Sequence, residues 1–311
     1  MKQKIKKYTN LVLKGFAMGA ANVIPGVSGG TIALITGIFE RLIDAIKSFN
    51  LTAIKLLFSG KIKDLLKHTD FYFLVAVFSG MVVSVVSLAK LLKYLFLNYP
   101  VFVWAFFFGL ILASVYYVGK AIKKWNLGVI LTFIIGTSVA ISISLFNPAT
   151  QNDSFFYLIL CGVIAICSMI LPGLSGSFIL ILLGNYELVM IDAVNNLDLK
   201  IILPVMIGAV GGLIAFSHIL SWIYKKYKDQ TISILTGFIL GSLGILWPWK
   251  NEIYRLDEAG NLMLKDGEKI VQSYSKYIPE SFNTEVIIAL ALMIIGIITI
   301  SLIEKLAGNQ N

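Results

Sequence analysis

The chain has 311 residues, of which 58% are hydrophobic and only 14% charged, and its mean hydropathy is +0.85. Soluble domains carry roughly 25% charged residues, so this composition excludes an ordinary soluble protein and indicates an integral membrane protein. The formal net charge is +9. Its lysines gather in the loops between hydrophobic segments, as the positive-inside rule expects, and we therefore expect no nucleic-acid partner.

Six apolar segments are long enough to cross a bilayer, which takes about 20 helical residues. Two further apolar regions, 11–46 and 155–194, are interrupted near their middle. We therefore expect an all-α polytopic membrane protein. The six predicted spans are 71–97, 100–119, 127–146, 201–223, 230–247 and 284–303.

The two interruptions carry the same short motif, 147 residues apart. At the same spacing Glu40 matches Glu187, and at a second spacing of 128 residues 108–114 match 236–242. The sequence therefore predicts two repeats, 1–150 and 151–311. The motif copies are Pro25-Gly26-Val27-Ser28-Gly29-Gly30 and Pro172-Gly173-Leu174-Ser175-Gly176-Ser177.

The distribution of lysine predicts the orientation of the repeats. The N-terminus and residues 47–70, 120–124 and 225–228 are rich in lysine, whereas 147–154 contains no lysine or arginine. If the lysine-rich segments are cytoplasmic, the second repeat begins on the opposite side from the first. We expect inverted repeats, each with a re-entrant or broken-helix hairpin and three spanning helices, and both termini in the cytoplasm.

Two segments fall outside the predicted spans. Residues 47–70 alternate apolar residues with lysines, which is typical of amphipathic helices on an anionic leaflet. Residues 248–283 lie outside the membrane in the predicted topology, and their alternation and turn residues indicate a small β-hairpin or meander. The sequence leaves open whether this insertion has a chemical role.

The repeated motif is suited to breaking a helix inside a membrane. Proline lacks a backbone donor and glycine allows left-handed dihedral angles, so one helix ends and another begins near Ser28 to Thr31. The first N–H groups of the new helix have no intrahelical partner and attract anions. We expect Ser175 and Ser177 to approach the first motif near the midplane. The alternative is that the small residues only allow close helix packing.

Four further polar positions recur in the two halves. Glu40 and Glu187 each follow an aromatic residue, and either take part in proton or cation coupling or lie at the interface. Arg41, which is close to both Glu40 and Asp44 along the chain, could neutralise Glu40.

Lys90 and His218 match at the spacing of 128 residues, each inside a predicted span. They could contact a phosphate or titrate, although Lys90 could also extend its amine to the interface.

The sequence predicts no enzyme. Its two histidines, His68 and His218, allow no multi-histidine metal site, and neither a nucleotide-binding P-loop nor a serine nucleophile elbow is present. We expect no metal and no cofactor.

The motif with Asn22 three residues before it, together with its second copy, resembles the bacterial polyprenyl-phosphate transporter family PopT over nearly the whole chain. The resemblance implies a flippase in the bacterial cytoplasmic membrane that returns undecaprenyl phosphate from the outer to the inner leaflet. It also implies that the motif residues 28–31 and 175–177 line the headgroup site. Phe178 replaces the hydroxyl that Thr31 supplies in the first copy, so the two halves need not contribute equally.

The motif is also similar to the Pro-Gly-x-Ser-Arg-Ser loop of membrane undecaprenyl-pyrophosphate phosphatases. Here Gly29 and Gly176 replace the arginine that would stabilise the transferring phosphoryl group.

We therefore expect a transporter for a polyprenyl phosphate lipid, with possible proton or sodium coupling, and the sequence names no protein partner. A small-anion transporter or channel, a lipid phosphatase and a non-transporting scaffold are the alternatives.

Overall fold

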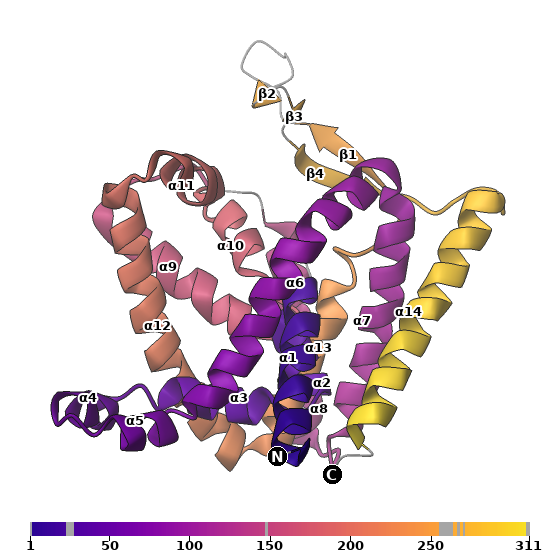
Figure 1. Ribbon diagram of the computed structural model, residues 1–311. Helices are drawn as coiled ribbons and strands as arrows, with labels where there is room; N and C mark the ends of the chain where they lie inside the picture. The colour runs from indigo at the N-terminus through magenta and orange to yellow at the C-terminus, as the bar shows by residue number, and fades with distance from the viewer. Residues whose placement is uncertain are drawn as a thin grey trace.

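The computed structural model describes residues 2–22, 28–146, 149–254, 264–265, 268–269 and 271–308. These residues form an all-α membrane protein with small strands at one end (Figure 1). Helix α1 begins and helix α14 ends at the other end of the bundle, which we call the terminal face (Figure 1). Four described helices, α6, α7, α12 and α14, are long and apolar enough to span a membrane, so the chain is a multi-pass membrane protein.

The first half of the chain contains a broken hairpin, two short helices and three long helices. The hairpin enters from the terminal face and returns to it (Figure 1). Its helices are α1 (Lys2–Asn22), α2 (Gly29–Ile35) and α3 (Phe39–Lys47), followed by α4 (Leu51–Phe58), α5 (Ile62–His68), α6 (Phe71–Asn98), α7 (Pro100–Lys120) and α8 (Leu127–Leu145).

The second half begins with a hairpin that enters from the opposite end of the bundle (Figure 1). A π-helix, η1, takes the place that α3 has in the first hairpin. The elements are α9 (Phe155–Ile170), α10 (Gly176–Leu182), η1 (Glu187–Asp192), α11 (Ala193–Asn196), α12 (Leu199–Lys226), α13 (Lys228–Ser242) and α14 (Thr284–Gly308).

Five of the six predicted spans match observed helices to within a few residues. The sixth, predicted to reach residue 247, is α13 and ends at Ser242. The apolar residues after it turn toward Pro248, and a residue that precedes proline is disfavoured in the helical conformation. Hydropathy alone therefore overestimated the length of this helix.

The two short helices α2 and α10 end in the same way. Gly37 and Gly184 follow them with a φ of +71° each. The next amides bond back across the last turn, Ile38 N to the Ala33 oxygen at 2.9 Å and Asn185 N to the Leu180 oxygen at 3.0 Å. This is the pattern of a glycine-terminated helix, and glycine adopts the left-handed conformation without steric cost.

The last carbonyl groups of these short helices receive side-chain donors from the preceding helix. Lys14 Nζ donates to the Thr36 oxygen at 2.7 Å, and the Tyr157 hydroxyl donates to the Leu183 oxygen at 2.9 Å. A helix end away from water requires such partners. The carbonyl groups at the ends of α2 and α10 thus accept hydrogen bonds at matching positions, from different side chains.

The long helices pair in a pattern that repeats when the two halves are exchanged. Helix α1 packs on α6 as α9 packs on α12, and α7 packs on α14 as α13 packs on α8. Glycines allow the close approach: a Cβ on Gly80 would collide with the Val12 oxygen, and one on Gly208 with the Ile159 oxygen. This pairing agrees with an inverted duplication, which stays a prediction about how the chain is built.

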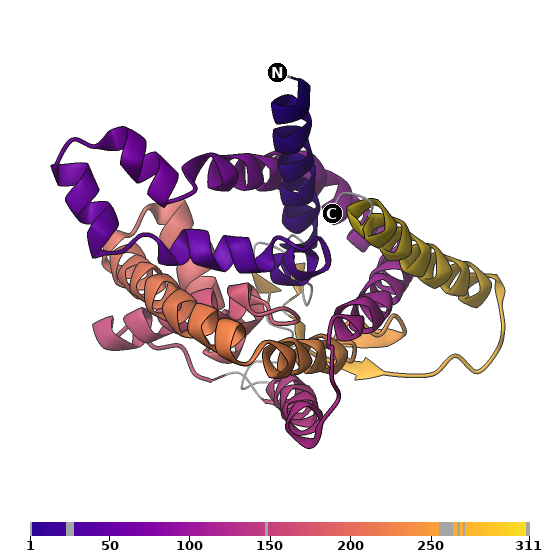
Figure 2. The same ribbon diagram turned by 90° about the horizontal axis from the view of Figure 1, so that it is seen from below.

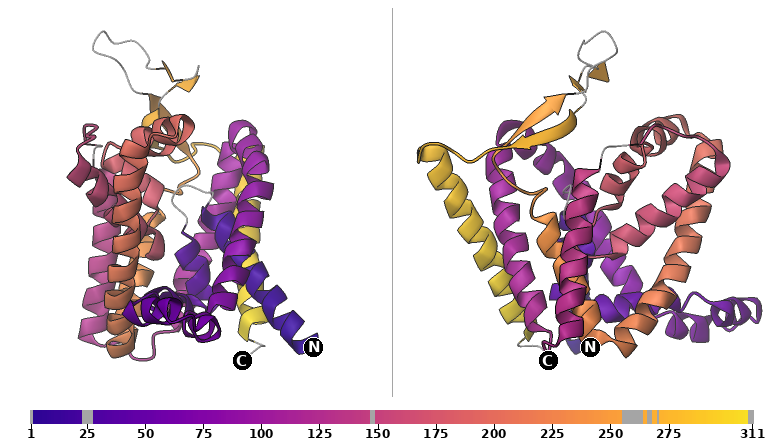
Figure 3. Two further views of the ribbon diagram at one scale, coloured as in Figure 1. Left: turned by 60° about the vertical axis from the view of Figure 1, so that its left-hand side comes forward. Right: turned by 180° about the vertical axis from the view of Figure 1, so that it is seen from behind.

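Short strands lie at the end of the bundle opposite the terminal face (Figure 3). Strand β1 (Lys250–Tyr254) pairs antiparallel with β4 (Val271–Lys276), and β2 (Leu264–Lys265) with β3 (Glu268–Lys269). The sequence predicted a small β-hairpin or meander within 248–283 from alternation in 253–256 and 262–264, of which residues 255–256 and 262–263 lie outside the described residues. It did not predict β4, which pairs with β1 across the intervening segment.

Candidate functional site

The two helix breaks meet inside the bundle. Gly173 N donates to Thr31 Oγ1 at 3.2 Å, and Ser28 Oγ donates to the Met169 oxygen at 3.3 Å, although the partners are more than 140 residues apart in sequence. Pro172 is buried at the start of the second turn. The described parts of the two motifs therefore meet through Thr31 and Gly173, whereas the predicted approach of Ser175 and Ser177 to the first motif stays a prediction. Pro25 and Gly26, which belong to the same predicted site, lie outside the described residues.

Close packing accounts for two of the motif glycines. A Cβ on Gly30 would lie 2.5 Å from the Ile170 oxygen, and one on Gly173 would lie 2.6 Å from the Phe238 oxygen. Gly173 also has a φ of +83°, which side chains rarely adopt. The packing interpretation is therefore sufficient for these positions, and the case for ligand binding depends on the hydroxyl and amide groups.

The first motif has its polar groups paired within the protein. Asn22 Oδ1 accepts from Gly29 N at 2.6 Å, and Ser28 Oγ accepts from Gly30 N at 3.1 Å. Thr31 N donates to the Ser28 backbone oxygen at 3.0 Å. The exposed fractions of Ser28 and Thr31 are 2% and 0%. In this conformation residues 28–31, the described part of the first motif, are buried and their hydroxyl groups are not exposed to a ligand.

The second motif differs because Met169 occupies the position that asparagine has in the first, and its side chain offers no comparable acceptor. Ser175 Oγ lies 2.8 Å from Ser177 Oγ, and both residues are partly exposed. Among the described residues, nothing accepts a hydrogen bond from the amides of Gly176, Ser177 or Phe178. Buried amides normally have a partner, so this group has the chemistry to bind an oxyanion.

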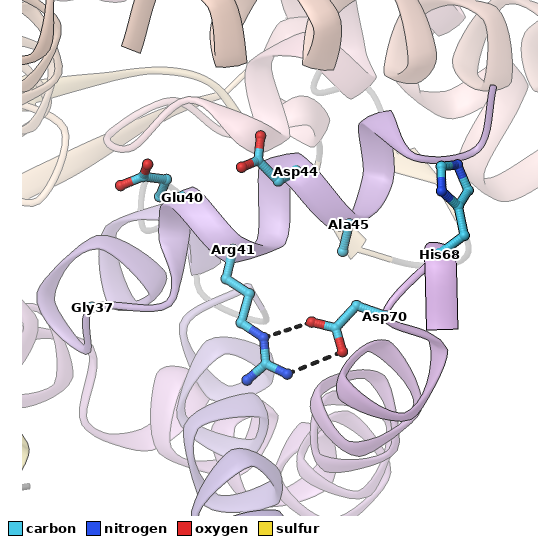
Figure 4. Close-up of a pocket in the computed structure, with 7 residues that line it drawn as sticks. All are labelled: Gly37, Glu40, Arg41, Asp44, Ala45, His68 and Asp70. Carbon is cyan, nitrogen blue, oxygen red and sulfur yellow. Dashed lines mark hydrogen bonds and ion pairs between the residues drawn. The ribbon is translucent and has the colours of Figure 1, made fainter. Parts of the chain in front are cut away.

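A separate charged cluster lies at the terminal face, where α3 meets the end of α12 (Figure 4). Arg41 makes two bonds to Asp70, at 2.6 and 3.0 Å, beside a cavity of about 470 Å³. Glu40 pairs with Lys228 at 3.4 Å. The sequence suggested that Arg41 neutralises Glu40. In the structure Arg41 pairs with Asp70 instead, and Glu40 pairs with Lys228.

Asp44 links α3 to α12. Its carboxylate accepts from Lys225 Nζ at 2.6 Å and from Ser221 Oγ at 2.7 Å. Burial opposes its ionisation, but the hydrogen bonds from Lys225 and Ser221 and the charges of Lys225 and Lys47 outweigh it and hold the pKa of the Asp44 carboxyl below its ordinary value. No local sequence signal could identify these partners, which are about 180 residues away.

The remaining predicted residues lie at other places in the fold. His218 Nδ1 is 2.8 Å from the Ile214 oxygen of its own helix. Lys90 belongs to α6, and its side chain lies outside the described residues. Glu187 is the first residue of η1. The hydrogen bond described for His218 therefore stays within its own helix.

Comparisons with known proteins identify the family. A family model described as VCA0040-like, undecaprenyl phosphate translocase-like, matches residues 18–263. A protein of Vibrio cholerae serotype O1 named polyprenyl-phosphate transporter is 38% identical over 314 residues, covering 99% of both chains. One of the same name from Staphylococcus aureus is 32% identical over 254 residues, covering 76% of this chain and 85% of its own. No solved structure shows significant similarity.

These matches confirm the resemblance that the motif copies carry, and they extend over the described hairpins and the long helices around them. The chain belongs to the undecaprenyl phosphate translocase-like family.

Proposed function

We propose that this protein transports a polyprenyl phosphate lipid, undecaprenyl phosphate, from the outer to the inner leaflet of a bacterial cytoplasmic membrane and so recycles the carrier. The names of its relatives support the substrate class. The single structural observation that carries the proposal is the contact between two broken helices that enter from opposite ends of the bundle, one of which leaves a group of amides unpaired.

The phosphate binds at the second motif. Ser175 and Ser177 supply hydroxyl donors, and Gly176 and its neighbours supply backbone N–H groups. A hydrogen bond to a charged group contributes roughly 1.5–3 kcal/mol, so a few such bonds can hold a headgroup while the isoprenoid tail stays in the lipid. The first motif, residues 28–31, contributes its groups only when the contact through Thr31 opens.

Transport proceeds by alternating access around this site. At the terminal face Asp44 and Glu40 tie α3 to Lys225 and Lys228 of α12 and α13. We infer that the described state is the one open to the outer leaflet, because these ion pairs hold α3 at the terminal face. The lysine pattern supports a cytoplasmic position for the terminal face, and with it for both termini.

The tie is weak enough to break in each cycle. Lys225, Asp44, Lys228 and Glu40 are each more than a third exposed, and exposed ion pairs contribute only about 0.2–1 kcal/mol. We also propose that a proton or sodium gradient drives the change, with Glu40, Glu187 and His218 as the candidate coupling groups. Transport that proceeds equally with and without both gradients would exclude this coupling.

The reaction is transport without hydrolysis. Gly29 and Gly176 lack the guanidinium that the phosphatase loop uses on its phosphoryl group. The protein should therefore release no inorganic phosphate from undecaprenyl pyrophosphate in detergent, and release at an enzymatic rate would replace this proposal with a lipid phosphatase.

Native mass spectrometry of gently purified protein tests headgroup binding. We expect a bound polyprenyl phosphate, and at least about 100-fold weaker retention after Ser175→Ala with Ser177→Ala, since the two lost bonds together cost about 3–6 kcal/mol. Ser154→Ala is the matched control because Ser154 is exposed and its hydroxyl caps no helix. Equal retention by both variants would place the headgroup elsewhere.

Proteoliposomes test transport itself. A fluorescent polyprenyl phosphate should change leaflet in vesicles that contain the protein, and excess inorganic phosphate should not compete fully. Uptake of inorganic phosphate without movement of the lipid would favour a small-anion carrier.

A further inference from the structure

Helices α4 and α5 form a flap that extends sideways from the bundle, and we define the flap as residues 51–68. Both helices lie at the terminal face, across the direction of the long helices (Figures 1 and 3). Seen from below, they project beyond the neighbouring helices (Figure 2). The flap therefore occupies the level at which the spanning helices leave the membrane.

The base of the flap is held closed. Arg41, before the flap, makes two bonds to Asp70, immediately after it, and its guanidinium lies 4.1 Å from the ring centre of Phe73. His68 Nε2 lies 3.3 Å from Asn50 Oδ1. These contacts hold the two ends of the flap together beside α3. The rest of the flap projects beyond the neighbouring helices (Figure 2).

That outer surface is strongly apolar. The exposed fraction is 86% for Phe58 and 75% for Leu51, and three more large apolar side chains of the flap are exposed. Several large apolar side chains exposed within one short segment indicate an interaction site. The three further residues are Ile54, Leu57 and Ile62.

The same segment carries four exposed lysines and one acidic residue, Asp64, a net charge of about +3 when His68 is neutral. Lysines beside exposed Leu and Phe are the composition of helices that lie in the plane of an anionic bilayer surface. Insertion deep into hydrocarbon is excluded because each ammonium there costs several kcal/mol. The lysines are Lys55, Lys61, Lys63 and Lys67.

We propose that the flap binds the anionic phospholipid surface of the leaflet at the terminal face, with Phe58 and Leu51 inserted at the level of the headgroups and acyl ester groups. Charge complementarity favours a lipid surface over a second copy of this chain, because two copies of the flap would bring like charges together. The inference is independent of what the protein transports.

Spin labels on the full-length protein in nanodiscs test this proposal, in a background with Cys161→Ala and Cys167→Ala. A label at Phe58→Cys should be reached by oxygen more readily than by a water-soluble nickel complex when the nanodisc contains phosphatidylglycerol. A label at Lys63→Cys, on the same flap, should remain accessible to nickel. A label at site 58 that is equally accessible to nickel with and without phosphatidylglycerol would overturn the proposal.

Charge is tested separately with the lysines at 55, 61, 63 and 67 changed to Gln. Each lysine near an anionic surface changes the binding equilibrium roughly fivefold, so this variant should lose the phosphatidylglycerol-dependent protection at site 58. Protection of the same size in pure phosphatidylcholine would exclude anionic lipid as the ligand. Distances between labels on two copies that report close pairing would assign the flap to self-association instead.

Discussion

At the scale of single residues, the two motifs are alike in sequence but differ in their hydrogen bonds. Asn22 caps the first broken helix, whereas the matching Met169 cannot, and the second helix keeps free amides. The difference between Asn22 and Met169 is thus one reason why we propose the second copy as the headgroup site in this conformation.

Thr31→Val should destabilise the contact between the motifs. Valine has nearly the shape of threonine but cannot accept from Gly173 N, and an unpaired buried amide costs about 1–3 kcal/mol. Thermal unfolding in detergent should show a lowered midpoint. Thr299→Val is the control because that hydroxyl bonds only to the Ile295 oxygen of its own helix. Equal midpoints for the two variants would mean that the hydrogen bond to Gly173 contributes nothing.

The tie at the terminal face should depend on pH through Asp44. Since folding lowers the pKa of this carboxyl, its contribution is fully present above the ordinary aspartate value of about 3.9 and is lost as the pH falls through the folded value. The stability difference between the wild-type protein and Asp44→Asn should therefore stay constant near neutral pH and shrink only under acid conditions.

Urea unfolding at several pH values measures this difference, with the exposed Asp153→Asn as the control. If the stability difference between the wild-type protein and Asp44→Asn already disappears between pH 7 and pH 5, the pKa of Asp44 is not lowered by folding.

At the scale of helices, close glycine contacts decide how the hairpin helices pack. Gly208 faces the Ile159 oxygen across the contact of α9 with α12, while nothing lies within 4 Å of a Cβ built on Gly211, three residues along the same helix. The matching contact of α1 with α6 uses Gly80. Backbone approach of this kind is typical of helix pairs in membranes.

Gly208→Ala and Gly211→Ala should therefore have opposite effects. Alanine is favoured over glycine in a helix by about 0.8–1.0 kcal/mol, so Gly211→Ala should leave stability unchanged or raise it. Gly208→Ala must move α9 away from α12, and overpacking costs typically about 1–3 kcal/mol. Unfolding midpoints of the two purified variants provide the comparison. Equal midpoints would show that α9 and α12 separate easily.

At the scale of the whole molecule, the contact of Asp44 with Lys225 joins α3 to α12 at the terminal face. The proposed alternating access requires the contact between Asp44 and Lys225 to open. Holding α3 against α12 should therefore stop transport without preventing lipid binding.

A short thiol-reactive cross-linker applied to Asp44→Cys with Ser221→Cys tests this requirement in a background without Cys161 and Cys167. Cross-linking should abolish lipid movement in proteoliposomes and preserve bound lipid in native mass spectrometry. Leu199→Cys with Leu203→Cys, both exposed on α12 alone, should transport normally after the same treatment. Continued transport by the cross-linked first pair would exclude the tie as a gate.

Much of the architecture follows from hydropathy and local chemistry. Long apolar runs specify the spanning helices because an α-helix pairs its backbone N–H and C=O groups within itself, as lipid requires. The Pro-Gly motifs locate the breaks, and Gly37 and Gly184 locate the ends of the short helices. Where hydropathy was wrong, at the end of α13, the nearby Pro248 was a local signal that the apolar run concealed.

By itself, the sequence determined the membrane class, the positions of the helices and breaks, and the duplicated motif, because these depend on residues close together in the chain. Only the tertiary structure decided that Gly173 meets Thr31, that Glu40 pairs with Lys228 rather than Arg41, and that Asp44 ties α3 to α12. Those partners are 142 to 188 residues apart. Such contacts depend on how whole helices pack, and no short pattern records that packing.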